Sequence, residues 1–483
     1  MSAVFKFADV QGNIVRGYRR KPRVRHLVLE ITDRIAARRW LAACASGGED
    51  VPRITTGDWK AVEPVTCFNI GLTYEGLRAL GTPDSSLETF PIEFVQGMNA
   101  RALKLGDVGE SAPETWPAPF NDPKRIHIVA TIYAHEIAQL NQVQHQALAD
   151  GKALRLLGAP PDGCSFAHDL VHFGYRDNIM QPRLEGVHDA DRYADGQPRA
   201  PLGTVLLGYS TNFEGLMWRV PEPERLGHNG TFNAFRVLKQ DVAGFEAYLD
   251  TAAQDLLGQA TIAELLPLGP DAIGKGLSPH AALREVVAAN MCGRWRRNGT
   301  PLALSPDTPN PSPAVDLAKF DYVGDSRCPY GAHIRRCNPR GGHIVQRVAN
   351  NSRRLVRRGV PYGPSYDPAQ PRDPNQAEQE RGLLGNFIGA SLGAQFEAMS
   401  CDWLNLGLQD PRITGSNDPI AGPNDPLSSW FDLPLKSGNT IRLRGLPRFV
   451  QTRGGAYTFL PSLEAIRFFW ITEELNSPKS CAA

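Results

Sequence analysis

A histidine in the second half of the chain stands in a segment whose residues could hold a metal-containing group. His333 follows Gly331 and Ala332, two small residues that leave room for a large, flat ligand to approach the imidazole. Arginines are dense on its C-terminal side, at positions 335, 336, 340, 347, 353, 354, 357 and 358. A haem needs an imidazole on its iron and cations beside its propionates, so this combination indicates a haem site. Taken alone, such a segment is more often a loop histidine in a solvated, arginine-rich surface.

Two further residues have side chains suited to peroxide chemistry. Asp177 lies in Phe173–Pro182, a turn-like segment that contains a glycine and ends at a proline. A carboxyl group in an apolar cavity can exchange protons with a bound peroxide, although an aspartate that caps its own turn is the ordinary alternative. Arg357 lies in the basic segment Arg353–Gly363. An arginine near an iron would stabilise negative charge on a breaking O–O bond, and the alternative is a basic strand face in water.

Alternating hydrophobic patterns predict strands and helices in both halves of the chain. In the first half we expect strands at Val24–Ile31, Val65–Leu72, Ile126–Tyr133 and Thr204–Tyr209, and helices at Arg34–Cys44, Glu75–Leu80 and His135–Ala149. In the second half we expect strands at Thr231–Val237 and Gly382–Gly389, helices at Asp241–Leu257, Gln395–Leu404 and Leu463–Phe469, and short strands at Phe449–Thr452 and Ala456–Phe459 around Gly454–Gly455. These patterns predict two α+β domains, residues 1–215 and 216–483. We expect the two domains to share a structure but no sequence repeat.

The stretch from Thr300 to about Gln379 departs from this pattern. It is rich in Pro, Gly, Asn and Arg and has little periodicity. A segment of that length without regular structure inside a domain is usually functional or disordered. Because it contains His333, we expect it to be functional.

Composition excludes several classes of protein. The chain has 483 residues, 42% hydrophobic and 21% charged, with 52 Lys and Arg against 51 Asp and Glu. A net charge near zero gives no support for nucleic acid or a membrane surface as partner. The eight cysteines contain no CxxC pair, which favours reduced thiols over a disulfide framework or zinc cluster. With neither a signal-peptide pattern nor a run of about 18 apolar residues, we expect a cytoplasmic protein.

Five segments, in order along nearly the whole chain, resemble motifs of the dye-decolorising peroxidases, a haem peroxidase family with two ferredoxin-like halves. They are Asp9–Gly17 (DVQGNIVRG), Gly174–Asp177 (GYRD), Cys328–Arg340 (CPYGAHIRRCNPR), Arg357–Gly363 (RRGVPYG) and Arg453–Ser462 (RGGAYTFLPS). The resemblance implies antiparallel sheets, one haem b per chain and a haem pocket mainly in the C-terminal domain, with the Asp177 segment supplied by the N-terminal one.

The resemblance also implies roles for individual residues. His333 would be the proximal iron ligand, Asp177 would move a proton between the two peroxide oxygens on the opposite face, and Arg357 would contact the cofactor and steady the peroxide by charge. A carboxylate should accept the other N–H of His333, because such partners make the ligand more basic. Asp418 is our candidate, with Asp425 as the alternative.

Two positions depart from the family pattern. The glycine that usually follows the aspartate is Asn178 here, and asparagine tolerates left-handed backbone better than most residues. Its amide could also hydrogen-bond Asp177. The phenylalanine that usually follows a pair of leucines is Gly385, which widens the distal pocket unless Phe387 or another residue fills the space.

The expected function is peroxide reduction coupled to the oxidation of phenolic, dye-like or other small aromatic donors. Because the ordinary pKa of an aspartate is about 3.9, an aspartate acid–base group predicts an acidic pH optimum. The alternatives are a protein that carries or dechelates haem, and a haem-dependent oxidase dedicated to one metabolite with weak peroxidase activity. No tyrosine or tryptophan is assigned an electron-transfer role, and the oligomeric state stays open.

Overall fold

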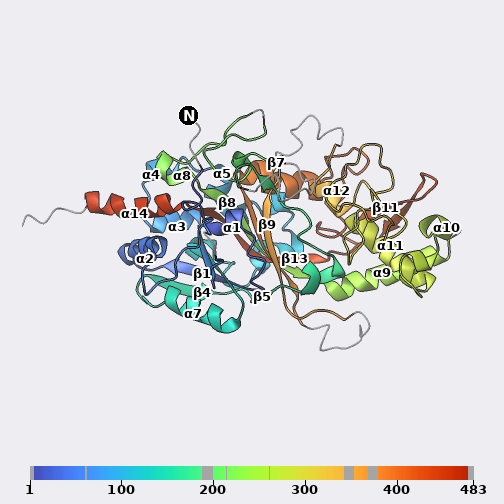
Figure 1. The fold of residues 1–483 in the computed structure, drawn as a ribbon, viewed down its shortest axis with the longest axis horizontal. Coiled ribbons are helices and arrows are strands. Elements are labelled where there is room, and N and C mark those ends of the chain that lie inside the picture. The colour runs from blue at the N-terminus through green and yellow to red at the C-terminus, as the bar shows by residue number, and fades with distance from the viewer. Residues whose placement is uncertain are drawn as a thin grey trace, which may run out of the picture.

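The computed structural model describes residues 5–59, 62–187, 199–213, 215–259, 261–341, 353–367 and 379–476. Its strands are β1 (Arg23–Ile31), β2 (Cys67–Leu72), β3 (Ile128–Ala134), β4 (Leu154–Gly158), β5 (Gly163–Cys164), β6 (Arg183–Leu184), β7 (Arg199–Ala200), β8 (Thr231–Gln240), β9 (Val356–Tyr362), β10 (Gly382–Gly389), β11 (Trp430–Pro434), β12 (Thr440–Arg444) and β13 (Val450–Leu460). One nine-stranded sheet contains most of them (Figure 1).

This sheet closes on itself. Its strand order is β3-β2-β13-β8-β10-β9-β5-β1-β4, and β1 also pairs with β3 in antiparallel register from Arg23↔Ala134 to Leu29↔Ile128. The two halves of the chain therefore each contribute a set of strands to one ring, and the interior of the ring is filled by apolar side chains from both. All neighbouring strands in this sheet are antiparallel, as the family resemblance implies.

The halves meet along two narrow seams. β2 pairs with β13 at Phe459↔Leu72, and β5 pairs with β9 at Gly163↔Tyr362. Within the second half, by contrast, β8 pairs with β10 along eight residues and with β13 along ten. The α+β architecture of two ferredoxin-like halves is confirmed, while the domain boundary at residue 215 stays a prediction.

The helices lie mostly outside the ring. The α-helices are α1 (Gly12–Val15), α2 (Arg34–Ser46), α3 (Tyr74–Ala79), α4 (Asp84–Leu87), α5 (Ile92–Ala100), α6 (Ala102–Leu105), α7 (Ile137–Ala147), α8 (Glu224–Gly227), α9 (Val242–Leu257), α10 (Ile262–Leu265), α11 (Pro279–Cys292), α12 (His333–Cys337) and α14 (Leu463–Asn476). Short 3-10 turns connect them, at Gly109–Ser111, Pro113–Thr115, Pro123–Arg125, Ala167–Asp169, His172–Gly174, Leu202–Thr204 and Pro270–Ala272. Within the described ranges, none of these helices has the length and apolarity that crossing a lipid bilayer demands.

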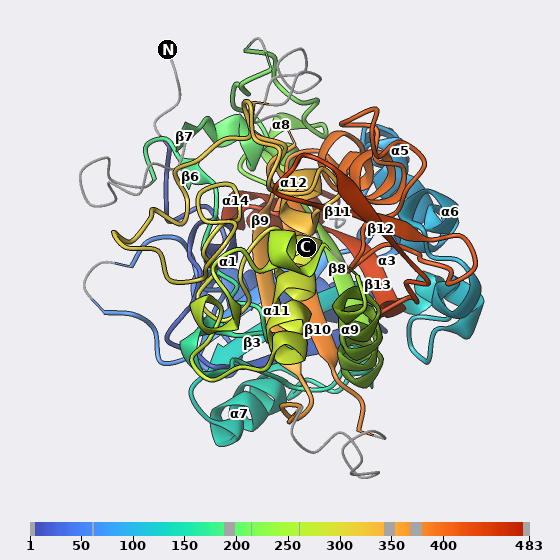
Figure 2. The same cartoon turned by 90° about the vertical axis from the view of Figure 1, so that its right-hand side faces the viewer.

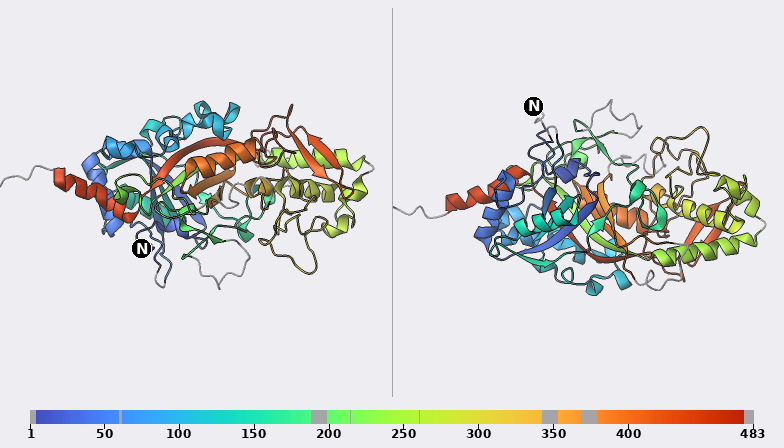
Figure 3. Two further views of the ribbon diagram at one scale, coloured as in Figure 1. Left: turned by 90° about the horizontal axis from the view of Figure 1, so that it is seen from above. Right: turned by 60° about the horizontal axis from the view of Figure 1, so that its bottom comes forward.

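Two helix pairs mark opposite ends of the molecule. α2 packs on α14 beside the first-half strands, and α9 packs on α11 at the other end (Figures 1 and 3). Figure 2 faces this second end, with α9, α11 and the β11–β12 hairpin toward the viewer. α9 begins where the Asp241 side chain accepts a hydrogen bond from the Gly244 N–H, and it buries one apolar face. That face and α11 build a second hydrophobic core, separate from the one inside the ring.

The end of α11 prepares the position of α12. Gly293 follows α11 with φ of 91° in the left-handed region, where glycine is favoured. A Cβ at this position would come within 2.7 Å of Ile334 Cγ1 and 3.3 Å of Ala332 Cβ. The glycine therefore ends α11 and lets the segment that leads into α12 pack directly against it.

Several expected elements differ from the structure. Thr204–Tyr209 is not a strand: Val205 and Leu206 are buried in a tight turn in which both N–H groups donate to Leu202 O, and the fourth first-half strand is β4. A short apolar run cannot distinguish a strand from a buried turn. The helix expected at Gln395–Leu404 exists as two π-helical segments, Leu392–Glu397 and Met399–Asn405.

Other differences concern continuity. β13 is one strand where the sequence predicts two short ones, because the register shift between Thr452 and Gly454 absorbs the glycine pair as a bulge. The irregular stretch expected from Thr300 contains α12 and β9, and α11 was not predicted at all. Both α12 and β9 contribute side chains to the cavity that His333 lines.

Candidate functional site

A cavity of about 430 Å³ lies between the ring and α12. Its floor is one face of β8, β10 and β9, and its opposite wall comes from α12 and the π-helical segment Met399–Asn405. Gly385 and Gly359 face each other across β10 and β9 in this floor. Neither glycine has a side chain, and the phenyl ring of Phe387 covers the floor at Gly385.

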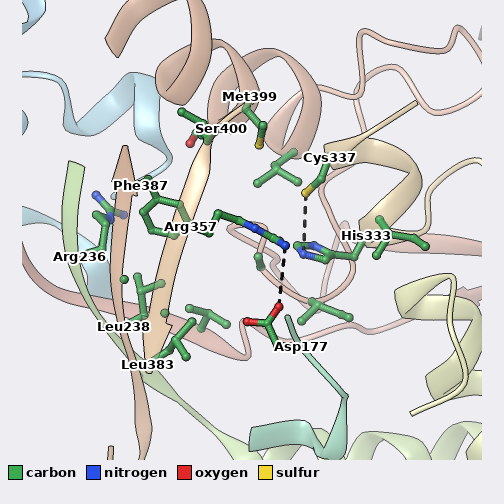
Figure 4. A pocket seen from close by; sticks show the side chains of 18 of the residues that line it. Asp177, Arg236, Leu238, His333, Cys337, Arg357, Leu383, Phe387, Met399 and Ser400 are labelled. Atoms are coloured by element: carbon green, nitrogen blue, oxygen red, sulfur yellow. Dashed lines mark hydrogen bonds and ion pairs between the residues drawn. The ribbon is translucent and has the colours of Figure 1, made fainter. Parts of the chain in front are cut away.

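His333, Asp177 and Arg357 all line this cavity, although they come from three distant parts of the chain. Figure 4 shows Arg357 extending from β9 toward His333, with Asp177 beside the tip of the guanidinium group. The structure thus brings together the three residues that the sequence singled out separately.

The first residue of α12 is His333, and a buried carboxylate holds its ring. His333 Nδ1 lies 3.0 Å from Asp418 Oδ2, and the Asp418 side chain is completely buried. The other oxygen, Asp418 Oδ1, accepts hydrogen bonds from the N–H groups of Ile420 and Ala421. The imidazole is therefore oriented from behind, and its Nε2 edge is left on the cavity side.

The charge state of Asp418 follows from these contacts. Burial alone would raise the pKa of this carboxyl group. The charge and hydrogen bond of His333, the charge of Arg336 and the Ala421 N–H outweigh burial and lower the pKa below its usual value. Asp418 therefore stays ionised and keeps a proton on Nδ1. The pKa of His333 is raised in turn, so a metal would bind at Nε2 in exchange for the proton on that nitrogen.

Asp425, the alternative partner for His333, lies elsewhere. Its Oδ1 accepts the N–H of Leu427, two residues on, so Asp425 closes a local turn. His172, the nearest competing histidine, is buried, and its Nε2 lies 2.9 Å from Tyr362 O. His343, the other competitor, lies outside the described residues.

Asp177 and Arg357 form a pair at the opposite side of the cavity from α12. Arg357 Nη2 lies 3.8 Å from Asp177 Oδ1 and donates a hydrogen bond to Met180 O at 3.1 Å. Both side chains are partly open to the cavity. The arrangement offers a carboxylate that can take up a proton next to a cation that can stabilise negative charge.

The turn that carries Asp177 is tied to β9 through one side chain. Gln181 Oε1 accepts the Arg357 N–H at 3.1 Å, and Gln181 Nε2 donates to Arg357 O at 3.1 Å. A single amide thus satisfies both backbone groups of Arg357, much as a neighbouring strand would. This contact fixes the two peroxide-handling candidates relative to each other, and it was missed because an isolated glutamine has no sequence signature.

Asn178 keeps the turn that the family builds with glycine. Its φ is +56°, so the residue adopts the left-handed conformation that asparagine tolerates. Its amide does not bond Asp177, because Nδ2 donates instead to Asp169 Oδ1 at 3.4 Å. The substitution therefore preserves the backbone and leaves the Asp177 carboxylate facing Arg357.

Gly385 does not leave a gap in the floor. A Cβ at position 385 would come within 2.6 Å of Phe387 Cε2, because the phenyl ring of Phe387 lies over the glycine. Phe387 is two residues along β10, on the same face of the strand, and its ring packs against Phe396 with centroids 5.4 Å apart. Phe387 therefore supplies the aromatic wall that the sequence left in doubt.

The arginines after His333 divide into two groups. Arg335 and Arg336 are buried and donate to carbonyl oxygens, among them Cys328 O and Gly331 O, so they hold α12 in place and do not face the cavity. Arg358 donates to Asn13 O. The cavity is lined by Arg340, Arg353, Arg354 and Arg357, and Arg347 lies outside the described residues.

Gly331 and Ala332 do not leave room for a ligand beside His333, contrary to the expectation from the sequence. Neither residue lines the cavity: Ala332 packs on the end of α11, and a Cβ at Gly331 would meet Phe431 and Arg336. Their small size serves the packing of α12. A missed cavity residue is Cys337, whose Sγ lies 3.8 Å from His333 Nε2. It stands four residues after His333, so helical spacing alone would have placed it on the same face.

Comparisons with known proteins identify what the chain is similar to. Residues 9–153 match the family model described as the DyP dimeric alpha+beta barrel domain. The chain is 27% identical to the dye-decolorizing peroxidase msp1 of Mycetinis scorodonius over 497 residues, covering 96% of this chain and 88% of that protein. It is 28% identical to a dye-decolorizing peroxidase of Mycena epipterygia over 449 residues, with coverage of 84% and 76%.

Solved structures of dye-decolorizing peroxidases match the chain over nearly its full length. A dye-decolorizing peroxidase in complex with 2,6-dimethoxyphenol superposes with a TM-score of 0.75 at 26% identity, covering 96% of this chain and 99% of that one. An ancestral D-type dye decolorizing peroxidase superposes with a TM-score of 0.78 at 26% identity and the same coverage.

Proposed function

The chain belongs to the dye-decolorising peroxidases, and from that premise we propose that it reduces hydrogen peroxide on a haem held by His333, with Asp177 and Arg357 handling the peroxide. Members of this family are haem-dependent peroxidases, and one relative has been solved with a phenol, 2,6-dimethoxyphenol. The donors proposed for this chain are small aromatic molecules of the same kind. Each turnover would consume one H₂O₂ and two phenolic donors and yield two H₂O and two phenoxyl radicals.

The residues of the cavity fit a haem. Two histidines of the described residues line it. His172 Nε2 lies 2.9 Å from Tyr362 O, whereas His333 Nε2 has only the weaker contact with Cys337 Sγ at 3.8 Å, so His333 is the imidazole with a nitrogen to offer. Burial and the nearby charge of Arg340 lower the pKa of Arg354 to about 10, so an added carboxylate beside this pair would be favourable. Arg340, Arg353 and Arg354 would therefore receive the propionates. One haem b per chain is the proposed complement.

The chemistry divides between the cofactor and the chain. Haem, when bound, supplies the iron that accepts the oxidising power of peroxide and passes it to donors one electron at a time. Asp177 would take a proton from one oxygen of the peroxide and return it to the other oxygen, which then leaves as water. Arg357, 3.8 Å from that carboxylate, would stabilise the negative charge that builds up as the O–O bond stretches.

His333 and Asp418 would act from the α12 side of the cavity. The ionised Asp418, bonded to Nδ1, would make the imidazole a stronger donor to a bound iron and would favour the oxidised states of that iron. This His333–Asp418 pair, with Nε2 open to a cavity that also contains Asp177 and Arg357, is the observation on which the proposal depends.

The test is an absorption spectrum before and after peroxide. Purified, haem-reconstituted protein should show a Soret band that shifts within milliseconds to seconds of mixing with H₂O₂, and a pyridine haemochrome spectrum should identify haem b. The His333→Ala variant should lose ordered haem binding, while the His172→Ala variant should retain it. An unchanged Soret band in the wild-type protein would indicate a haem carrier and contradict the proposal.

A further inference from the structure

A second, smaller cavity of about 250 Å³ lies on the outer side of the segment that carries Asp177. It is lined by Arg19, Arg176, Asn178, Ile179, Gln181, Arg183, Asp316, Leu317 and Ala318. Arg176, Ile179 and Gln181 line the main cavity as well. The segment from Arg176 to Gln181 is therefore a wall one chain thick, with the proposed peroxide site on one side and this outer cavity on the other.

The outer cavity gathers positive charge. Arg19 comes from the N-terminal part of the chain, Arg176 and Arg183 lie seven positions apart in a second segment, and Asp316 is the carboxylate among the lining residues. Arg19 Nη2 donates to Asn178 O at 3.1 Å, and Arg176 Nη1 donates to Asn298 O at 3.4 Å. Neither of these two guanidinium groups forms an ion pair with a carboxylate anywhere in the described ranges, so both keep donors for an incoming anion.

We propose that this outer cavity binds the carboxylate of an aromatic electron donor, an inference that rests on the proposed peroxidase function and specifies its substrate class. Guanidinium groups bind planar carboxylates through paired hydrogen bonds, and several of them converge here. Ile179 and Leu317 supply apolar contact for an aromatic ring beside the charged groups. A phenolic acid has both features in one small molecule.

The location suits a donor that does not enter the main cavity. The bound donor would give up one electron and its phenolic proton, two donors serving each peroxide, so the stoichiometry of the peroxidase reaction is unchanged. Its ring would lie against the outer side of Ile179, a residue whose inner side lines the main cavity. Peroxide and donor could then be held at the same time without competing for space.

Binding is measured on the ferric haem protein without peroxide. Isothermal titration with 4-hydroxy-3-methoxybenzoate and with its methyl ester compares two probes that differ in the carboxylate charge. The acid should bind about tenfold more tightly than the ester, and this preference should weaken as salt is raised, because Arg19 and Arg176 are exposed. In the Arg19→Gln and Arg176→Gln variants the preference should fall to about onefold.

Arg444→Gln is the matched control, because it removes the same charge from an exposed position on β12, outside the lining of both cavities. It should leave the preference for the acid intact. Equal binding of the two probes by the wild-type protein, or an equal loss in the control and in both cavity variants, would overturn the proposal. Because the titration contains no peroxide, it tests binding in the outer cavity independently of whether the Soret band responds to H₂O₂.

Discussion

At the scale of single residues, the site depends on how each charged side chain is partnered. Asp418 is completely buried yet ionised, because His333 and two backbone N–H groups satisfy both of its oxygens. Asp177, by contrast, faces the cavity with Arg357 at 3.8 Å and keeps room for a further partner. Asp418 is placed to orient the His333 ring, and Asp177 is placed to exchange a proton.

Replacing Asp177 with Asn should keep the haem and slow its reaction with peroxide. The amide preserves the size of the side chain but cannot accept the proton, and positioned acid–base groups typically contribute about 10²–10⁴-fold. Stopped-flow absorption at the Soret band measures this step. Asp84→Asn, which changes an exposed carboxylate on α4 outside the cavity lining, is the control and should stay near the wild-type rate. A fully active Asp177→Asn variant would remove Asp177 from the mechanism.

The pH profile of turnover should have an acidic optimum. An aspartate acid–base group has an ordinary pKa of about 3.9, far below that of a histidine in the same role. Steady-state rates with a neutral phenol, measured from pH 3 to pH 8, check this expectation. A rate that still rises toward pH 8 would show that another group controls the proton transfer.

At the scale of elements, the relation between the Asp177 turn and β9 is set by side-chain contacts, because the turn itself has little regular structure. Gln181 bonds both backbone groups of Arg357, and Asn178 adopts the left-handed φ that the turn requires. Behind them, β10 presents Phe387 over Gly385, so the floor keeps an aromatic wall. Elements from both halves must therefore be in register before the cavity takes its shape.

Gln181→Leu tests this connection. The leucine has a similar size but leaves the Arg357 N–H and C=O without the amide, which costs about 1–3 kcal/mol of stability. We expect a lower melting temperature and a reaction with peroxide about tenfold slower, with the haem content unchanged. Gln451→Leu, which removes a single exposed contact to Glu110 O, should change neither value. If the peroxide step keeps its wild-type rate, the turn does not depend on Gln181.

At the scale of the whole molecule, buried charges join the two halves where the strands barely pair. Glu397 ends the π-helical segment Leu392–Glu397 of the second half, and its side chain is completely buried. It binds Arg101 of the first half at 2.6 Å and accepts a hydrogen bond from Tyr457. Burial alone raises the pKa of Glu397, but the hydrogen bonds from Arg101 and Tyr457 outweigh it, and the net pKa is lowered.

The sign of the pH dependence follows from this lowered pKa. In the unfolded chain a glutamate titrates near pH 4.3, so the stabilisation is complete above that value and is lost as the pH falls through the lower, folded-state pKa. Glu397→Gln should therefore cost about 2 kcal/mol of unfolding free energy at pH 7 and clearly less near pH 3. Denaturant unfolding at both values measures the difference.

The control for this prediction is Glu464→Gln. Glu464 lies 3.8 Å from Arg225 with both side chains about 60% exposed, and such surface pairs contribute little. It should change the unfolding free energy slightly and equally at both pH values. A penalty for Glu397→Gln that does not shrink in acid would mean that its ion pair with Arg101 does not link the halves.

The sequence by itself determined many of the elements and the chemistry of the candidate residues. β1, α2, β8 and β10 could be predicted because their hydrophobic periodicity is local, and Asp418 was chosen for His333 although 85 positions separate them. The same local reasoning failed at Thr204–Tyr209, where burial depends on distant strands.

Only the tertiary structure decided how the parts meet. It showed that the sheet closes through β1 and β3, that Phe387 covers Gly385, and that Arg335 and Arg336 support α12 while other arginines face the cavity. The direction in which a side chain points depends on strand register and on contacts far away in the chain. Neither is encoded in the spacing of residues within a segment, which is why spacing identified the candidates and the fold assembled them.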